Sequence, residues 1–181
     1  MNLPNRLTLM RVVLIPVFLV VLLLELPNVE VSRYIAAGIF ALASITDWLD
    51  GFLARKYNLV TNFGKFADPL ADKLLVCAAL VALTSLGDVA AWVTILIISR
   101  EFIVTGFRLI AMEQGIVLAA GIWGKMKTAV TMLMILWVLV LNSMEVAFTI
   151  GQVLIYLSAV LTVISAVEYI VKNFNVLKDV K

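Results

Sequence analysis

Four aspartates lie within a stretch of 26 residues whose neighbours are mostly apolar: Asp47, Asp50, Asp68 and Asp72. Inserting an ionised aspartate at the centre of a membrane span costs about 2.5–3.5 kcal/mol of free energy, so we expect these aspartates to have a function. Spacings of three and four residues place the members of each pair on one helix face. Four close carboxylates repel one another unless cations bridge them, and Mg²⁺ or Mn²⁺ prefers such all-oxygen ligands. This pattern therefore predicts a divalent metal site of the kind used in phosphoryl transfer.

Two other interpretations of these aspartates stay open. In one, they form interfacial ion pairs with nearby basic side chains, namely Arg55, Lys56, Lys65 and Lys73. In the other, they line an ion pathway, as intramembrane acids do in transporters. Residues 35–45 and 74–83 are almost wholly apolar, which disfavours a path across the membrane. Beside the acids, Gly51 and Ala54 leave a depression lined by small residues.

The residues that are missing exclude several other chemistries. The chain contains no histidine, so a histidine base and a histidine-ligated metal are excluded. Cys77 is the single cysteine, which excludes an internal disulfide and a zinc or iron–sulfur site of several thiolates. A net charge of +2 is too small to indicate a nucleic-acid partner. Carboxylates, arginine, lysine and backbone groups remain for polar chemistry.

Composition places these residues in a membrane. Of the 181 residues 64% are apolar and 14% charged, too few charges to cover a soluble domain of this size. Six stretches have about the 20 residues that a helix needs to cross the hydrocarbon core. They are residues 7–26, 34–57, 66–86, 89–112, 125–141 and 146–171. We expect an all-α integral membrane protein with six transmembrane helices, forming one domain over residues 1–181.

The basic residues predict the orientation of these helices. With the N-terminus inside, 13 of the 14 lysines and arginines fall on the inner side and only Arg33 on the outer side. The positive-inside rule then places both termini in the cytoplasm. We therefore expect a multi-pass protein of the cytoplasmic membrane whose acidic site faces the cytoplasm.

Read in order, the acidic region matches a known pattern: Asp47-x2-Asp50-Gly51-x2-Ala54-Arg55-x8-Gly64-x3-Asp68-x3-Asp72. It resembles the defining motif of the CDP-alcohol phosphotransferase family of membrane phospholipid synthases, at every fixed position. The six-helix expectation fits that family across the whole chain. The resemblance implies a homodimer that binds two divalent ions, Mg²⁺ or Mn²⁺, on Asp47, Asp50, Asp68 and Asp72.

The resemblance also implies roles for individual residues. Asp72 would be the base that deprotonates the acceptor hydroxyl, although the sequence leaves open whether it is only a ligand. The residues implied to bind the donor, CDP-diacylglycerol, are Asn5, Thr8, Asp50, Gly51, Ala54, Arg55 and Gly64. For Asn5 and Thr8, capping of the first helix is an equal alternative.

Three further segments resemble the members of the family whose acceptor is sn-glycerol 3-phosphate: Pro4-Asn5-x2-Thr8-x2-Arg11, Ile98-Ser99-Arg100-Glu101-x4-Gly106-x-Arg108 and Gly124-Lys125-x-Lys127-Thr128. The products would be phosphatidylglycerophosphate and CMP, in a membrane of lipid partners. A phosphorylated acceptor requires cations, and the candidates are Arg100, Arg108, Lys125 and Lys127. Inositol, serine or phosphatidylglycerol as acceptor, a cation transporter and a salt-bridged membrane scaffold remain the alternatives.

Arg100 is the most informative of these cations, because it lies roughly 16 Å into its helix and needs a partner there. Glu101 is adjacent in sequence and so lies on a different face, which makes a substrate phosphate the expected partner. Lys125 and Lys127 point to nearly opposite sides of a regular helix. They can share one phosphate only where the chain is not yet helical, which Gly121 and Gly124 would permit.

Overall fold

The computed structural model contains six α-helices and, over the part of the chain that it describes, no strand. The backbone is described for residues 3–25, 28–56, 62–113, 121–141 and 145–173, and the side chains for residues 8–25, 28–47, 73–112, 121–141 and 146–173. The helices are α1 (Leu3–Leu24), α2 (Val29–Lys56), α3 (Asn62–Ser85), α4 (Ala91–Glu113), α5 (Ile122–Leu141) and α6 (Glu145–Asn173). The all-α prediction is confirmed.

Three helical segments are long and apolar enough to cross a membrane: Val29–Asp47, Ile122–Leu141 and Val146–Asn173. Two shorter apolar segments, Thr8–Leu24 and Lys73–Ser85, accompany them within the described residues. Helix α4 does not qualify and carries Arg100, Glu101 and Arg108. The structure thus supports a membrane protein with three candidate spans, while the count of six and the direction of the termini stay predictions.

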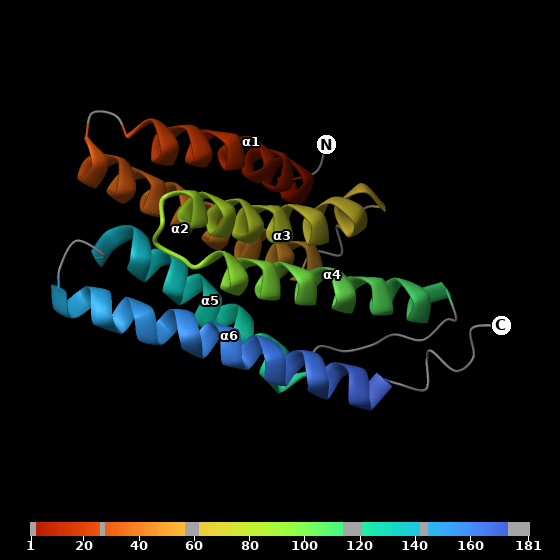
Figure 1. The fold of residues 1–181 in the computed structure, drawn as a ribbon. Coiled ribbons are helices and arrows are strands. Elements are labelled where there is room, and N and C mark those ends of the chain that lie inside the picture. The colour runs from red at the N-terminus through yellow and green to blue at the C-terminus, as the bar shows by residue number, and fades with distance from the viewer. Residues whose placement is uncertain (1–2, 26–27, 57–61, 114–120, 142–144, 174–181) are drawn as a thin grey trace. The chain divides into compact units, whose positions relative to one another are not determined.

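The helices, which are labelled in Figure 1, cluster into two compact units. The first unit comprises residues 1–86 and 138–140, and the second comprises residues 87–137 and 141–181. These are units of helix packing, and the expectation of one domain over residues 1–181 stays a prediction.

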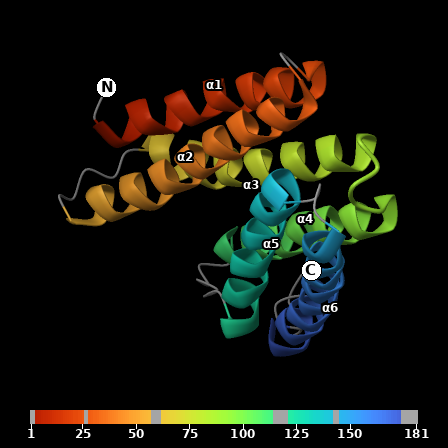
Figure 2. The ribbon, with the colours of Figure 1, turned by 90° about the vertical axis from the view of Figure 1, so that its left-hand side faces the viewer.

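In the first unit, α1 packs against both α2 and α3. Helix α1 runs beside α2 in both views (Figures 1 and 2). The rings of Phe18 and Phe40 are fully buried and join these two helices, with centroids 6.1 Å apart. Helix α2 begins five residues before the predicted span because Asn28 caps it. The Oδ1 atom of Asn28 accepts a hydrogen bond from the Val31 amide at 2.9 Å, the usual geometry of an N-cap.

In the second unit, α4 packs against α6, and hydrogen bonds join α5 to α6. The hydroxyls of Thr131 and Ser158, both buried, are 2.7 Å apart. Near the C-terminal end of α5, the indole of Trp137 donates to the carbonyl of Ala147 at 2.8 Å. Polar groups that meet between apolar helices satisfy one another where lipid offers no partner. These contacts fix the register in which α5 and α6 present their polar side chains.

Candidate active site

The first polar contact buried within the helices joins α1 to α2. The guanidinium of Arg11 is fully buried, and its Nη1 lies 2.5 Å from Oδ1 of Asp47, whose side chain is one-third exposed. Arg11 lies on α1 and Asp47 lies on α2. A charged side chain within a membrane requires a partner of opposite charge. The pair therefore orients the Asp47 carboxylate, which is the first of the four aspartates.

The remaining aspartates lie on helices whose backbone is described. Asp50 belongs to α2, and Asp68 and Asp72 belong to α3. Their side chains lie outside the described residues, as do those of Asn5, Gly51, Ala54, Arg55 and Gly64. The metal-binding and donor-binding roles of these residues stay predictions. Thr8, the other predicted donor-binding residue, is described and is almost fully buried, three residues before Arg11 on α1.

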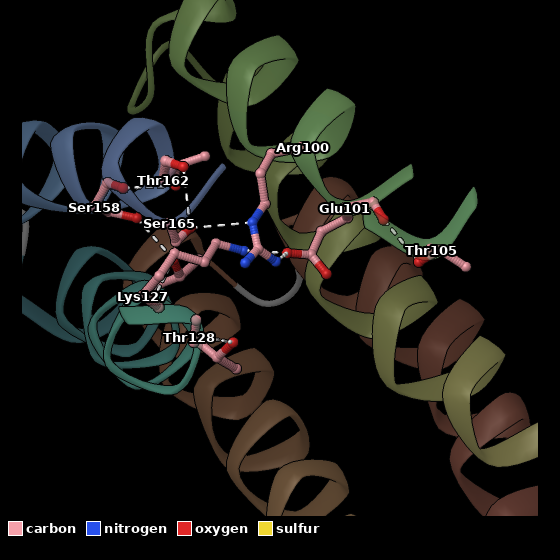
Figure 3. A network of polar contacts seen from close by, with 10 residues as sticks. Arg100, Glu101, Thr105, Lys127, Thr128, Ser158, Thr162 and Ser165 are labelled. Atoms are coloured by element: carbon pink, nitrogen blue, oxygen red, sulfur yellow. Dashed lines mark hydrogen bonds and ion pairs between the residues drawn. The ribbon is translucent and has the colours of Figure 1, made fainter. Parts of the chain in front are cut away.

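A second and larger polar network lies within α4, α5 and α6 (Figure 3). One carboxylate oxygen, Oε1 of Glu101, is 3.0 Å from Nη1 of Arg100 and 2.6 Å from Nζ of Lys127. The three side chains are 11%, 18% and 3% exposed for Arg100, Glu101 and Lys127. Two cations thus share one anion, and these three largely buried side chains together carry a formal charge of +1.

Helix α6 fixes the guanidinium of Arg100 from another side. The Nε atom of Arg100 donates to Oγ of Ser165 at 3.1 Å, and that hydroxyl donates in turn to the carbonyl of Thr162 at 3.0 Å. Since the hydroxyl proton is used on the carbonyl, an oxygen lone pair faces Arg100. Helix α5 approaches at Gly124, where a Cβ atom would stand 3.3 Å from Nη2 of Arg100.

The expectation that Glu101 would not partner Arg100 is wrong. Adjacent residues leave a helix in different directions, but both side chains are long enough to bend toward Lys127 on α5. The lysine is the reason for this convergence, because a buried ammonium requires an anion. Arg100 thus has protein partners already, and a substrate phosphate would join them instead of being the sole partner.

The other predicted phosphate ligands are placed unequally. Lys125 and Lys127 both lie in α5, which is helical from Ile122, and Lys125 is exposed while Lys127 is buried. The non-helical chain that joint binding of one phosphate required is therefore not found. Arg108 lies two turns further along α4, with its Cζ atom 5.9 Å from the centroid of the Tyr169 ring. The structure brings together Arg100 and Lys127, and places Arg108 against α6.

Comparison with known proteins gives this arrangement its context. The sequence pattern of the CDP-alcohol phosphatidyltransferase family matches residues 1–164. The chain belongs to this family. A CDP-diacylglycerol–glycerol-3-phosphate 3-phosphatidyltransferase of Bacillus subtilis (strain 168) is 45% identical, with 98% of this chain and 97% of that protein covered.

Two further relatives support the assignment of the chain to this family. A probable phosphatidylglycerophosphate synthase of Mycobacterium tuberculosis (strain ATCC 25618 / H37Rv) is 44% identical over 94% of this chain and 81% of its own length. A protein of Haemophilus influenzae with the same name as the Bacillus relative is 42% identical over 93% of this chain and 91% of its own. The resemblance found in the sequence is confirmed, and the chain is a phosphatidyltransferase of phospholipid synthesis.

Sequence reasoning on this phosphatidyltransferase missed two partners. Helical spacing argues against Glu101 as a partner of Arg100, although an Arg-Glu dipeptide deep in an apolar helix is itself a sign of a third charged group nearby. Ser165 gave no sequence signal, because a serine in a membrane helix usually bonds to its own backbone. Arg11 and Asp47 were each noticed, and their common need for a partner within the hydrocarbon could have joined them.

Proposed function

We propose that this protein transfers the phosphatidyl group of CDP-diacylglycerol to sn-glycerol 3-phosphate, giving phosphatidylglycerophosphate and CMP. The observation that carries the proposal is the Arg100–Glu101–Lys127 network, whose net positive charge suits a phosphorylated acceptor. The Bacillus and Haemophilus relatives carry names that state the same donor and acceptor, and they support this choice.

The acceptor phosphate binds at the network. Arg100 offers a planar fork of donors and Lys127 a compact ammonium, and both kinds of group bind phosphate. Arg108 and Lys125, nearer the proposed cytoplasmic ends of α4 and α5, attract the doubly charged acceptor toward them. The alcohols inositol and serine lack the phosphate that this arrangement would recognise.

The nucleotide and the reacting groups belong to the aspartate motif. Asn5, Thr8, Asp50, Gly51, Ala54, Arg55 and Gly64 form the donor site. Asp72 accepts the proton of the acceptor hydroxyl, whose oxygen then attacks the phosphorus that bears diacylglycerol. The bond from that phosphorus to the CMP oxygen breaks as the new bond forms, so no covalent enzyme intermediate arises.

The aspartates suit a divalent metal site by the chemistry of their donors. Asp47, Asp50, Asp68 and Asp72 offer only hard carboxylate oxygens, and Arg11 holds the first of these carboxylates in place. These four residues would hold two Mg²⁺ or Mn²⁺ ions. When bound, such ions neutralise charge on a diphosphate and stabilise the leaving phosphate.

We further propose six membrane spans with both termini in the cytoplasm and a site that faces the cytoplasm, where CMP and glycerol 3-phosphate are soluble. A homodimer is the expected assembly. The exposed apolar side chains on all six helices, for example Val20, Ile45, Val81, Phe102, Leu133 and Val160, suit contact with lipid.

The test is CMP release by the purified protein in lipid–detergent micelles with CDP-diacylglycerol and Mg²⁺. Glycerol 3-phosphate, inositol, serine and phosphatidylglycerol are supplied singly, each with and without EDTA. We expect CMP release only when glycerol 3-phosphate is the acceptor, and we expect EDTA to abolish it. Release that depends on another acceptor contradicts the acceptor assignment, and release that EDTA leaves unchanged contradicts the metal site.

A further inference from the structure

We propose that Glu101 is a positioning residue. It holds the two cations that bind the acceptor phosphate and does not itself contact the phosphate. Its carboxylate holds the Arg100 guanidinium and the Lys127 ammonium side by side, in the arrangement that receives the phosphate. This inference rests on the proposed function, because it assigns the phosphate end of that reaction to the network.

The geometry that supports it is the sharing of one oxygen. Both cations bond to Oε1 of Glu101, at 3.0 Å for Arg100 Nη1 and 2.6 Å for Lys127 Nζ. The two nitrogens therefore lie no further apart than the sum of these distances, although their residues belong to different helices. Without the carboxylate, two like charges at this separation repel each other.

Burial explains why an anion is needed before any substrate arrives. The side chain of Lys127 is 3% exposed, and a buried ammonium without a counter-ion is costly enough to move or to lose its proton. Glu101 supplies this counter-ion before any phosphate binds. The three side chains together carry a formal charge of +1, which suits a phosphate, and the two cations are already ordered when the phosphate binds.

A hydrogen bond and a nearby glycine define the surroundings of the Arg100 guanidinium. Ser165 accepts from Nε at 3.1 Å, and Gly124 on α5 leaves space beside Nη2 that a larger residue would occupy. The guanidinium is thus held at two of its nitrogens, by Glu101 on α4 and Ser165 on α6 (Figure 3). Glu101 also holds Lys127, at 2.6 Å.

The experiment compares Glu101→Gln with the wild type in the CMP-release assay, varying each substrate in turn. Glutamine keeps the shape but loses the charge, so we expect the KM for glycerol 3-phosphate to rise about tenfold or more, the range for hydrogen bonds between charged groups. The KM for CDP-diacylglycerol should change less than about twofold. A general structural defect would lower the amount of active enzyme and leave the acceptor KM unchanged.

The matched control is Glu168→Gln on α6. The side chain of Glu168 is 20% exposed, close to the 18% of Glu101, and it pairs with Lys172 on its own helix at 2.5 Å. This control should keep both KM values. If Glu101→Gln does not yield folded protein, Glu101→Asp retains the charge on a shorter side chain that cannot reach both cations, and it should raise the acceptor KM about threefold.

A binding measurement separates this inference from the proposed reaction. Inorganic phosphate, added without CDP-diacylglycerol, should raise the Tm of the wild type and of Glu168→Gln but not that of Glu101→Gln. Phosphate stabilisation of the wild type without turnover would contradict the proposed function and keep the phosphate site. Equal stabilisation of the Glu101 variant, or an acceptor KM that falls or stays constant in it, would overturn the positioning role.

Discussion

At the scale of single residues, Asp47 serves the structure and, as proposed, the chemistry. It is the ion-pair partner of the fully buried Arg11 and the first residue of the aspartate motif. Loss of activity on replacing Asp47 would therefore be ambiguous, because it could come from a disturbed α1–α2 contact or from a lost metal ligand. The partner on α1 allows the two roles to be measured separately.

We predict that Asp47→Asn lowers stability, whereas the double variant Arg11→Met with Asp47→Asn recovers it. Leaving the Arg11 guanidinium buried without its anion costs about 3–5 kcal/mol, and an apolar side chain of similar length removes that cost. Turnover should fall at least about 100-fold in both variants, since even groups that only support a metal ligand are worth about 10–100-fold. Thermal unfolding in detergent and CMP release give the two readouts.

The single variant Arg11→Met completes this double-mutant cycle and shows whether the two side chains are coupled. Turnover close to wild type in the double variant would contradict the role of Asp47 as a metal ligand. It would instead favour the interpretation in which the aspartates are ion pairs only.

At the scale of elements, the start of α5 lies so close to side chains of α4 and α6 that small residues are needed there. A Cβ atom at Gly121 would stand 2.9 Å from Oε2 of Glu168, and one at Gly124 would stand 3.3 Å from Nη2 of Arg100. Gly124 is helical and Gly121 directly precedes the helix. They matter here because they lack a side chain, and not because glycine can adopt unusual backbone angles. They let α5 begin close to the charged side chains of α4 and α6.

We predict that Gly124→Ala raises the acceptor KM about two- to fivefold by shifting the Arg100 guanidinium, an effect of about 0.5–1 kcal/mol. The matched control is Gly38→Ala within α2, where an added Cβ atom meets nothing within 4 Å. Both changes remove a helical glycine, which by itself stabilises a helix by about 0.5–1 kcal/mol. We expect Gly38→Ala to gain this amount and Gly124→Ala to gain less, because its methyl group displaces Arg100. A raised acceptor KM in both variants, or in neither, would contradict the placement of Arg100 beside Gly124.

At the scale of the whole molecule, the distribution of basic residues predicts which side of the membrane each helix end occupies. Glu30 in the first turn of α2 should be outside, and Lys172 in the last turn of α6 should be inside. Both positions are exposed, and Cys77 is the single native cysteine. The chain is thus well suited to labelling with a thiol reagent that does not cross membranes.

In a Cys77→Ala background, Glu30→Cys should react with a membrane-impermeant maleimide in intact cells. Lys172→Cys should react only in inverted vesicles. Labelling is followed by the mass shift, and CMP release shows that each variant is native. Reaction of both positions from the same side would contradict an odd number of spans between them, and the reverse pattern would contradict the cytoplasmic location of the site.

Residue types and the apolar pattern are enough to predict which chemistry is available and which helices carry it. The absence of histidine and the spacing of the aspartates indicated the reaction class, because residue identity decides what a site can ligate or deprotonate. Apolar stretches indicated six helices, because lipid leaves the backbone no other hydrogen-bonding solution for a span. The boundaries were less accurate where a local contact decides them, as at Asn28, whose side chain starts α2 before the apolar stretch begins.

Which charged side chains meet depends on how the helices pack. Helical spacing separates Arg100 from Glu101 on α4, yet both bend toward Lys127, 26 residues further along the chain. The same holds for Arg11 and Asp47, which belong to different helices. The partner of a buried charge is the group on the helix that packs opposite, and helix pairing is a property of the whole set of packed faces. A single helix therefore specifies that its charge needs a partner, while the packing of helices selects that partner.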